Sequence, residues 1–131
     1  MAKTFRDLVT EARQVVEAIS PEEAEARVKA RPDTLVVDVQ DSQDSIACGL
    51  IPGAFNVSLG MLPIRADQEL PSAITDSRLQ DRSRPVITTC GAGGQAALGA
   101  KLLHDMGFTD VAFIDGGTRA WKEKGLPVTP A

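Results

Sequence analysis

The sequence predicts an α/β fold with a mostly parallel sheet, and three observations carry this prediction. Two nearly uninterrupted apolar runs, 34–39 and 84–90, are rich in β-branched residues, which is typical of strands buried on both faces. Stretches with helical periodicity alternate with these runs, as βαβ units require. The chain has 131 residues, of which 43% are hydrophobic and 24% charged, which is enough for one domain with its own core.

The N-terminal stretch is predicted to be helical. Residues 5–18 carry apolar side chains, such as Leu8 and Val15, at helical spacing between charged ones. We expect this amphipathic helix to pack on the domain or on a partner. The chain therefore divides into an N-terminal amphipathic helical extension over 1–18 and a domain over 19–131.

A second helix is predicted directly after the first. Ser20 is a natural N-cap, Pro21 suits the first helical position, and Glu23 completes a capping box. Pro32 ends this helix, because the residue before a proline is pushed out of the helical conformation.

The middle of the chain carries weaker signals. Polar residues 40–45 follow the first buried strand, and Cys48 lies in the loop-like stretch IACGLIPG. Residues 51–59 contain a turn and then a short strand. Residues 60–84 have a mixed character with two prolines, which predicts loop and a short helix.

The C-terminal half holds the clearest elements. The strand over 84–90 leads into a helix over 95–107, whose leucines share one face and which Gly107 caps. Residues 110–117 form another strand, which runs into a double glycine. Residues 118–125 form a short last helix.

Composition and charge exclude several function classes. The net charge of −4 leaves no electrostatic footprint for nucleic acid or an anionic membrane. No apolar segment is long enough to span a bilayer, and the charged start does not resemble a signal peptide. We therefore expect a cytoplasmic protein with two free thiols, Cys48 and Cys90. Their spacing does not suit a metal site.

The position of Cys90 suggests that its thiol is chemically active. It ends a predicted strand, and ligand sites of parallel sheets lie at the carboxyl ends of strands. The glycines that follow in GAGG allow a tight curl that aims backbone N–H groups inward. Together with the helix N-terminus, these donors would stabilise a thiolate, a persulfide or another anion. The alternative is a buried structural cysteine in an ordinary strand–loop–helix connection.

Three other chemistries lack the residues they need. A cysteine protease requires a histidine base, but His104 is nine positions beyond Gln95 in the same helix, more than ~10 Å along its axis. We expect His104 to be a solvated helix residue. A Walker-type phosphate loop needs Gly-Lys-Ser/Thr where the chain has GGQAA. A cysteine phosphatase needs an arginine at the sixth position after the thiol, which is Ala96.

Four segments, in order, resemble the rhodanese domain over about 19–128. They are LVVDVQD, CGLIPGAFNVSLG, VITTCGAGGQAALGAKLLHDMGF and VAFIDGGTRAWKEKGLPV. The segment SLGMLPIRAD is also similar to small single-domain bacterial sulfurtransferases of this family. The resemblance implies a rhodanese-like fold, with a five-stranded, mostly parallel sheet flanked by helices on both faces.

The resemblance also implies a chemistry. Cys90 would be the catalytic residue that attacks the outer sulfur of a small donor or a persulfide protein and becomes a persulfide. The sulfane sulfur would then pass to a thiol acceptor or to cyanide, without metal or organic cofactor. The implied substrate-binding loop comprises Gly91, Ala92, Gly93, Gly94, Gln95 and Ala96.

The sequence departs from the family pattern at three positions. Gln40, Leu50 and Gln95 stand where the family usually has arginine, histidine and arginine. Asp38, Gln40 and Arg65 are candidates for the edge of the site, and Arg65 or Arg119 would have to reach its mouth to supply positive charge. Because thiosulfate is a dianion, we expect poor use of this donor.

Two functions remain in competition. The first is a sulfurtransferase or persulfide carrier that works through Cys90. The second is a rhodanese-homology binding or regulatory module with reduced activity, which the missing arginines would favour. Cys48 is a candidate resolving thiol, and the chain is a candidate homodimer. We expect Trp121 in the core, Asp38 to hold the end of its strand through hydrogen bonds, and Asp115 in a turn.

Overall fold

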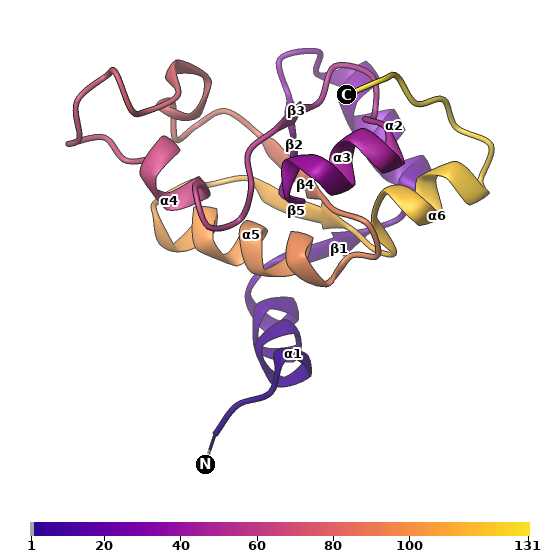
Figure 1. Ribbon diagram of the computed structural model, residues 1–131, viewed down its shortest axis with the longest axis horizontal. Coiled ribbons are helices and arrows are strands. Elements are labelled where there is room, and N and C mark those ends of the chain that lie inside the picture. Colours follow the sequence, from indigo (N-terminus) through magenta and orange to yellow (C-terminus); the bar gives the residue numbers. More distant parts are fainter. Residues whose placement is uncertain (1) are drawn as a thin grey trace.

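Five strands form one sheet at the centre of the computed structural model, which describes residues 2–131 (Figure 1). All four strand pairings are parallel, which confirms the predicted fold class. The strand order is β1 (Glu17–Ile19), β5 (Val111–Ile114), β4 (Val86–Thr89), β2 (Leu35–Asp38) and β3 (Phe55–Asn56). The helices are α1 (Phe5–Val15), α2 (Pro21–Ala30), α3 (Ser42–Cys48), α4 (Leu62–Arg65), α5 (Gly94–Asp105) and α6 (Gly117–Glu123), with a 3₁₀ turn η1 (Ser77–Leu79).

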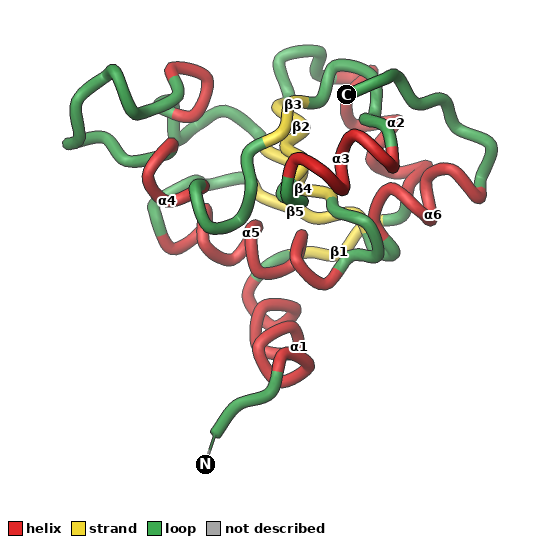
Figure 2. The backbone as a smooth tube through the Cα atoms, in the orientation of Figure 1, coloured by secondary structure: helices red, strands yellow, loops and turns green. Residues whose placement is uncertain are grey.

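Both faces of the sheet are covered, as a parallel sheet requires (Figures 1 and 2). Side chains of β2 alternate between two apolar clusters, because successive residues of a strand point to opposite faces. Leu35 and Val37 face the cluster that includes residues of α1, α4 and α5. Val36 faces the cluster that includes Ala24 of α2 and Trp121 of α6.

The N-terminal helix covers its own domain. Thr4 and Asp7 form a reciprocal capping box at its start, and Ala12 is fully buried, with α1 packed along α5. The predicted helix over 5–18 is too long, since α1 ends at Val15 and β1 begins at Glu17. Residues 17–19 pair with β5, and this edge pairing overrides the helical pattern. The division into 1–18 and 19–131 stays a prediction.

The cap of α2 differs in part from the prediction. The Ser20 hydroxyl accepts the Glu23 N–H at 3.1 Å, as expected of an N-cap. The prediction of a complete capping box is wrong, because the Glu23 carboxylate does not accept the Ser20 N–H. It accepts a hydrogen bond from Arg27 at 3.3 Å instead.

A short helix lies where polar loop was expected. Helix α3 spans residues 42–48, so Cys48 is its last residue and does not lie in a loop.

The expected places of Trp121 and Asp115 are confirmed. Trp121 is buried and its indole N–H donates to the Pro127 carbonyl at 2.8 Å, and Asp115 lies in the turn after β5. Within residues 2–131, no helix has the length and apolar character needed to cross a membrane.

Candidate active site

Cys90 follows the last residue of β4, between the carboxyl ends of β2 and β5. Its side chain is only 2% exposed. Helix α5 begins four residues later at Gly94, with Gly93 as its N-cap. The thiol therefore lies at the carboxyl ends of the strands and at a helix N-terminus, as the sequence predicted.

Two backbone amides donate to the sulfur. The N–H of Gly93 lies 3.0 Å from Cys90 Sγ, and the N–H of Ala96 lies 3.2 Å from it. Within the described residues, the amides of Gly91, Ala92, Gly94 and Gln95 have no hydrogen-bond acceptor. Part of the predicted cradle thus contacts the sulfur, and four other amides of the same loop are unpaired.

The loop can adopt this curl only because of its glycines. Gly93 has a φ of +105°, and a Cβ there would lie 2.9 Å from the Gly116 amide nitrogen. A Cβ at Gly91 would lie 3.3 Å from the side-chain oxygen of Gln40. A larger residue at Gly93 would therefore move the loop or the start of α6.

The first turn of α6 is hydrogen-bonded to the backbone of the loop, a contact that the sequence did not reveal. The N–H of Thr118 donates to the Cys90 carbonyl at 2.7 Å, and the N–H of Arg119 donates to the Gly91 carbonyl at 3.0 Å. The hydroxyls of Thr118 and Thr89 are hydrogen-bonded at 3.0 Å. Both threonines are fully buried, so these bonds fix the backbone on either side of the sulfur.

Asp38 organises the neighbouring edge of the site. Its buried carboxylate accepts the Gln40 N–H at 3.0 Å, the Gln40 amide at 3.1 Å and the Ser45 hydroxyl at 3.2 Å. Burial raises the pKa of Asp38, and these hydrogen bonds oppose that shift in part. The side chain of Asn56, another residue not singled out in the sequence, donates to the Asp38 and Gln40 carbonyls at 2.9 and 2.8 Å.

The other predicted edge residues lie apart from one another. Gln40 is buried against Gly91, so it does border the loop. Gln95 is half-buried in the first turn of α5. Arg65 donates to the Ile74 carbonyl at 2.6 Å and lines a separate hollow with Asp76, and no hydrogen bond joins it to the loop.

A hollow of 330 Å³ opens beside the loop. It is lined by Gln40, Asp44, Ala47, Cys48, Gly91, Arg119 and Lys122. Of the two candidate cations at the mouth, Arg119 therefore reaches the site and Arg65 does not. Lys122, which was not among the predicted site residues, also lines this hollow.

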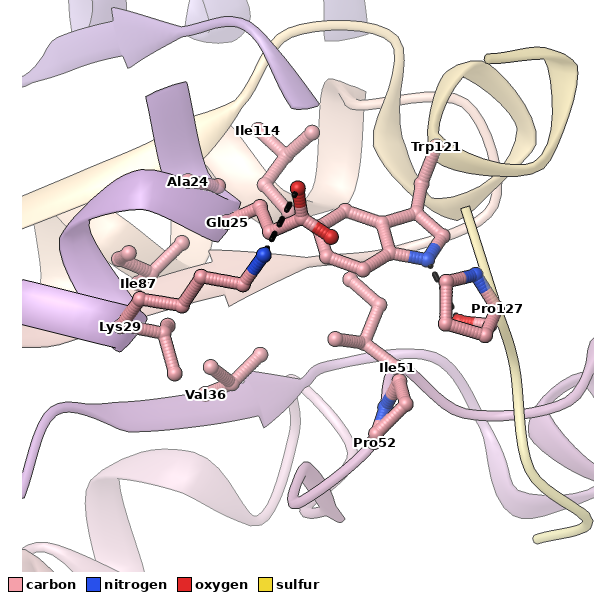
Figure 3. A pocket seen from close by; sticks show the side chains of 11 residues that line it. Ala24, Glu25, Lys29, Val36, Ile51, Pro52, Ile87, Ile114, Trp121 and Pro127 are labelled. Atoms are coloured by element: carbon pink, nitrogen blue, oxygen red, sulfur yellow. Dashed lines mark hydrogen bonds and ion pairs between the residues drawn. The ribbon is translucent and has the colours of Figure 1, made fainter. Parts of the chain in front are cut away.

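A second hollow, of 210 Å³, is apolar and lies between the sheet and the helices α2 and α6 (Figure 3). Ile51, Ile87 and the Trp121 ring project into it, and a Glu25–Lys29 ion pair lies at its rim. It contains no residue of the Cys90 loop and does not take part in the chemistry considered below. Within residues 2–131, no three histidine, cysteine or acidic side chains group as metal ligands would.

Comparison with known proteins identifies the family. Residues 20–124 match the sequence model of the rhodanese-like domain. The chain belongs to the rhodanese-like family. Its five-stranded parallel sheet is thus that of a rhodanese-like domain.

Two relatives of this rhodanese-like chain are named sulfurtransferases. A probable 3-mercaptopyruvate sulfurtransferase of Schizosaccharomyces pombe is 30% identical over 98% of the chain, which spans only 48% of that protein. A sulfurtransferase of Allochromatium vinosum is 29% identical over 87% of the chain and 95% of the relative. The chain spans about half the length of the first of these relatives and nearly the whole length of the second.

Two solved structures are also similar to this rhodanese-like chain. A protein of unknown function from Rhodopseudomonas palustris, described as a possible tyrosine phosphatase, is 30% identical with a TM-score of 0.89, covering 98% of this chain and 96% of that one. The polysulfide-sulfur transferase homodimer of Wolinella succinogenes is 29% identical with a TM-score of 0.72, covering 95% and 85%.

Proposed function

We propose that this protein is a sulfurtransferase that carries sulfane sulfur as a persulfide on Cys90. The observation that carries the proposal is the pair of backbone donors, Gly93 and Ala96, at 3.0 and 3.2 Å from Cys90 Sγ. Backbone amides fixed at a helix N-terminus stabilise negative charge on a thiolate or on a bound persulfide. The sulfurtransferase names of relatives about 30% identical support the same function.

In the loading step, the Cys90 thiolate attacks the outer sulfur of a donor R–S–S⁻. A sulfur–sulfur bond to Cys90 forms, the donor's sulfur–sulfur bond breaks, and R–S⁻ leaves. Unpaired amides at Ala92, Gly94 and Gln95 lie in the same loop, where they can offset charge on the transferred sulfur.

In the transfer step, an acceptor thiolate attacks the outer sulfur of the Cys90 persulfide. The acceptor leaves as a persulfide and Cys90 returns to the thiolate, so charge is conserved. Cyanide would accept the same sulfur to give thiocyanate. Thiosulfate is a poor donor in this proposal, because Gln40 and Gln95 offer no positive charge to its dianion.

Mass spectrometry of the intact protein tests the proposal. After exposure to polysulfide or glutathione persulfide, the wild type should gain the mass of one sulfur atom, which cyanide then removes as thiocyanate. Cys90→Ser should lose this gain, and Cys48→Ser should keep it. No sulfur gain from any donor would contradict the proposal and favour a binding or regulatory module.

A phosphatase function is disfavoured by the same loop. Phosphate would need a bidentate clamp, and the sixth position after Cys90 is the fully buried Ala96. Hydrolysis of p-nitrophenyl phosphate should therefore be absent in wild type, while sulfur loading occurs.

A homodimer, the division of the chain into 1–18 and 19–131, and a cytoplasmic location belong to the same proposal. Phe5 and Val15 of α1 are 56% and 44% exposed, and the Wolinella succinogenes relative is a homodimer. Sedimentation equilibrium should give twice the monomer mass for wild type and the monomer mass for Val15→Glu. A reducing compartment would keep both cysteines as thiols, as the structure has them.

A further inference from the structure

Three charged side chains line the hollow beside the Cys90 loop without a charged partner. They are Asp44 on α3 and Arg119 and Lys122 on α6. None of them forms an ion pair with another residue of 2–131, although the chain forms many such pairs elsewhere on its surface. The hollow therefore combines two available cations with one available carboxylate.

The two cations are held on one side of the hollow. Arg119 and Lys122 are three positions apart on α6, so their side chains share a face of the helix. The Arg119 backbone is bound to Gly91 at 3.0 Å, and Lys122 donates to the Cys48 carbonyl at 3.0 Å. These two bonds hold α6 against the loop on one side and against the end of α3 on the other.

The size of the hollow also limits its ligand. Its volume of 330 Å³ lies near the lower end of small-molecule sites, which span about 300–1,000 Å³. A single sulfur atom or a sulfite group would leave most of it unfilled. The wall formed by Gly91 brings a ligand in this hollow next to the loop that holds Cys90.

We propose that this hollow binds the acceptor, a low-molecular-weight thiol that carries both carboxylate and ammonium groups. Arg119 and Lys122 bind its carboxylate, and Asp44 binds its ammonium group. Free cysteine and a cysteine-containing peptide such as glutathione share this chemistry. The inference rests on the proposed function, since it concerns the molecule that takes sulfur from the Cys90 persulfide.

The bound thiol reacts as its thiolate, after losing its proton to solvent. It attacks the outer sulfur of the Cys90 persulfide, forms a new sulfur–sulfur bond, and leaves as the organic persulfide. The Cys90 thiolate is the leaving group, so no oxidant or reductant is needed. In this step the cations on α6 act on the carboxylate of the acceptor, at the mouth of the site.

A single-turnover experiment with four acceptors tests this inference. The persulfidated protein, freed of excess donor, is mixed with glutathione, 3-mercaptopropionate, cysteamine or 2-mercaptoethanol, and sulfur loss is followed by intact mass. Arg119→Gln and Lys122→Gln should each raise the half-saturation concentration for 3-mercaptopropionate and glutathione by up to about fivefold, the upper end of the range for one exposed charge contact. Asp44→Asn should raise it for cysteamine by a similar factor. The half-saturation concentration for 2-mercaptoethanol, which is uncharged, should change in none of these variants.

Matched variants separate charge from structure. Lys124→Gln removes the same charge at the end of the same helix, where Lys124 pairs with Glu22 at 3.6 Å, and should change no acceptor. Lys122→Arg should retain the preference for anionic thiols. Cysteine and glutathione, compared directly, distinguish the free amino acid from the peptide.

The outcomes also distinguish this inference from the proposed function. Absence of sulfur loading in wild type would overturn the proposed function itself. Normal loading with an unchanged preference for anionic over neutral thiols in the Arg119→Gln/Lys122→Gln double variant would overturn only the acceptor site.

Discussion

The backbone N–H of Thr118 donates to the carbonyl of Cys90 at 2.7 Å, across 28 positions of sequence. This bond ties the first turn of α6 to the residue whose sulfur accepts the Gly93 and Ala96 amides. A second bond, from the Arg119 amide to the Gly91 carbonyl, lies beside it at 3.0 Å. The shape of the loop therefore depends on α6 as well as on its own glycines.

Gly117→Ala should uncouple α6 from the loop. Gly117 has a φ of +64°, and a Cβ there would collide with the Cys90 carbonyl and crowd the Gly91 backbone. Because a displacement of about 1 Å at a reacting group costs on the order of 10²-fold in rate, we expect a loss of that size in sulfur transfer. Stopped-flow thiocyanate formation from the persulfidated protein measures it.

Gly125→Ala is the control for this effect. Gly125 has a similar φ of +76°, but a Cβ there meets nothing within 4 Å. Both variants bear the cost of a left-handed residue, about 1–2 kcal/mol of unfolding free energy. Equal transfer rates in the two variants would contradict a role for the contact with Cys90.

Elements with long, regular patterns could be predicted from the sequence. The β-branched runs that became β2 and β4 and the leucine-rich face of α5 are local signals, and Cys90 lies where they place it. Strand β1 was missed because it has three residues and exists through its pairing with β5. Helix α3 was missed because it is short and polar, with Ser45 as its buried residue.

The site was predictable only in part, for the same reason. The order of Cys90 and its glycines indicates the loop, but the contacts that shape it come from distant segments. Nothing local shows that Thr118 reaches Cys90 or that Arg65 turns toward Ile74. The i, i+3 spacing of Arg119 and Lys122 was the one available signal for the cations at the mouth, and it requires knowing that α6 borders the loop.

Thr118→Val should weaken the support of the loop through its hydroxyl alone. The change leaves the backbone bond to Cys90 and removes the hydroxyl bonded to Thr89 at 3.0 Å. Because both side chains are fully buried, we expect a loss of about 1–3 kcal/mol of unfolding free energy, measured by urea denaturation. Thr118→Ser keeps a hydroxyl and should recover most of it. The Thr89 hydroxyl also donates to the Cys90 carbonyl at 3.4 Å, so a Thr118→Val variant as stable as wild type would show that this longer bond is enough for it.

Arg82→Met should destabilise the fold without changing the site. The Arg82 guanidinium donates to the carbonyls of Ala66, Leu79 and Met106 at 2.7, 2.7 and 2.9 Å. Three acceptors would lose their donor, so we expect a loss of about 2–4 kcal/mol in unfolding free energy. Arg84→Met, which removes a donor from one carbonyl, should cost less. Sulfur loading of folded Arg82→Met protein should equal that of wild type, and a selective loss of loading would contradict a purely structural role.

The contribution of Asp38 to the stability of the protein should fall as pH rises through the acidic range. Burial raises the pKa of Asp38, so between its ordinary value of about 3.9 and the raised value the folded protein binds more protons than the unfolded chain. The free energy of unfolding of wild type minus that of Asp38→Asn should therefore be largest below pH ~3.9 and should decline by at most about 1.4 kcal/mol per pH unit above it. Denaturant unfolding of both proteins across this range measures the difference. Ser45→Ala removes a hydrogen bond that opposes the rise in the pKa of Asp38. In this variant the contribution of Asp38 to the free energy of unfolding should therefore go on declining to a higher pH. A difference that stays constant with pH, or that grows as pH rises, would mean that the hydrogen bonds from Gln40 and Ser45 outweigh the burial of the carboxylate.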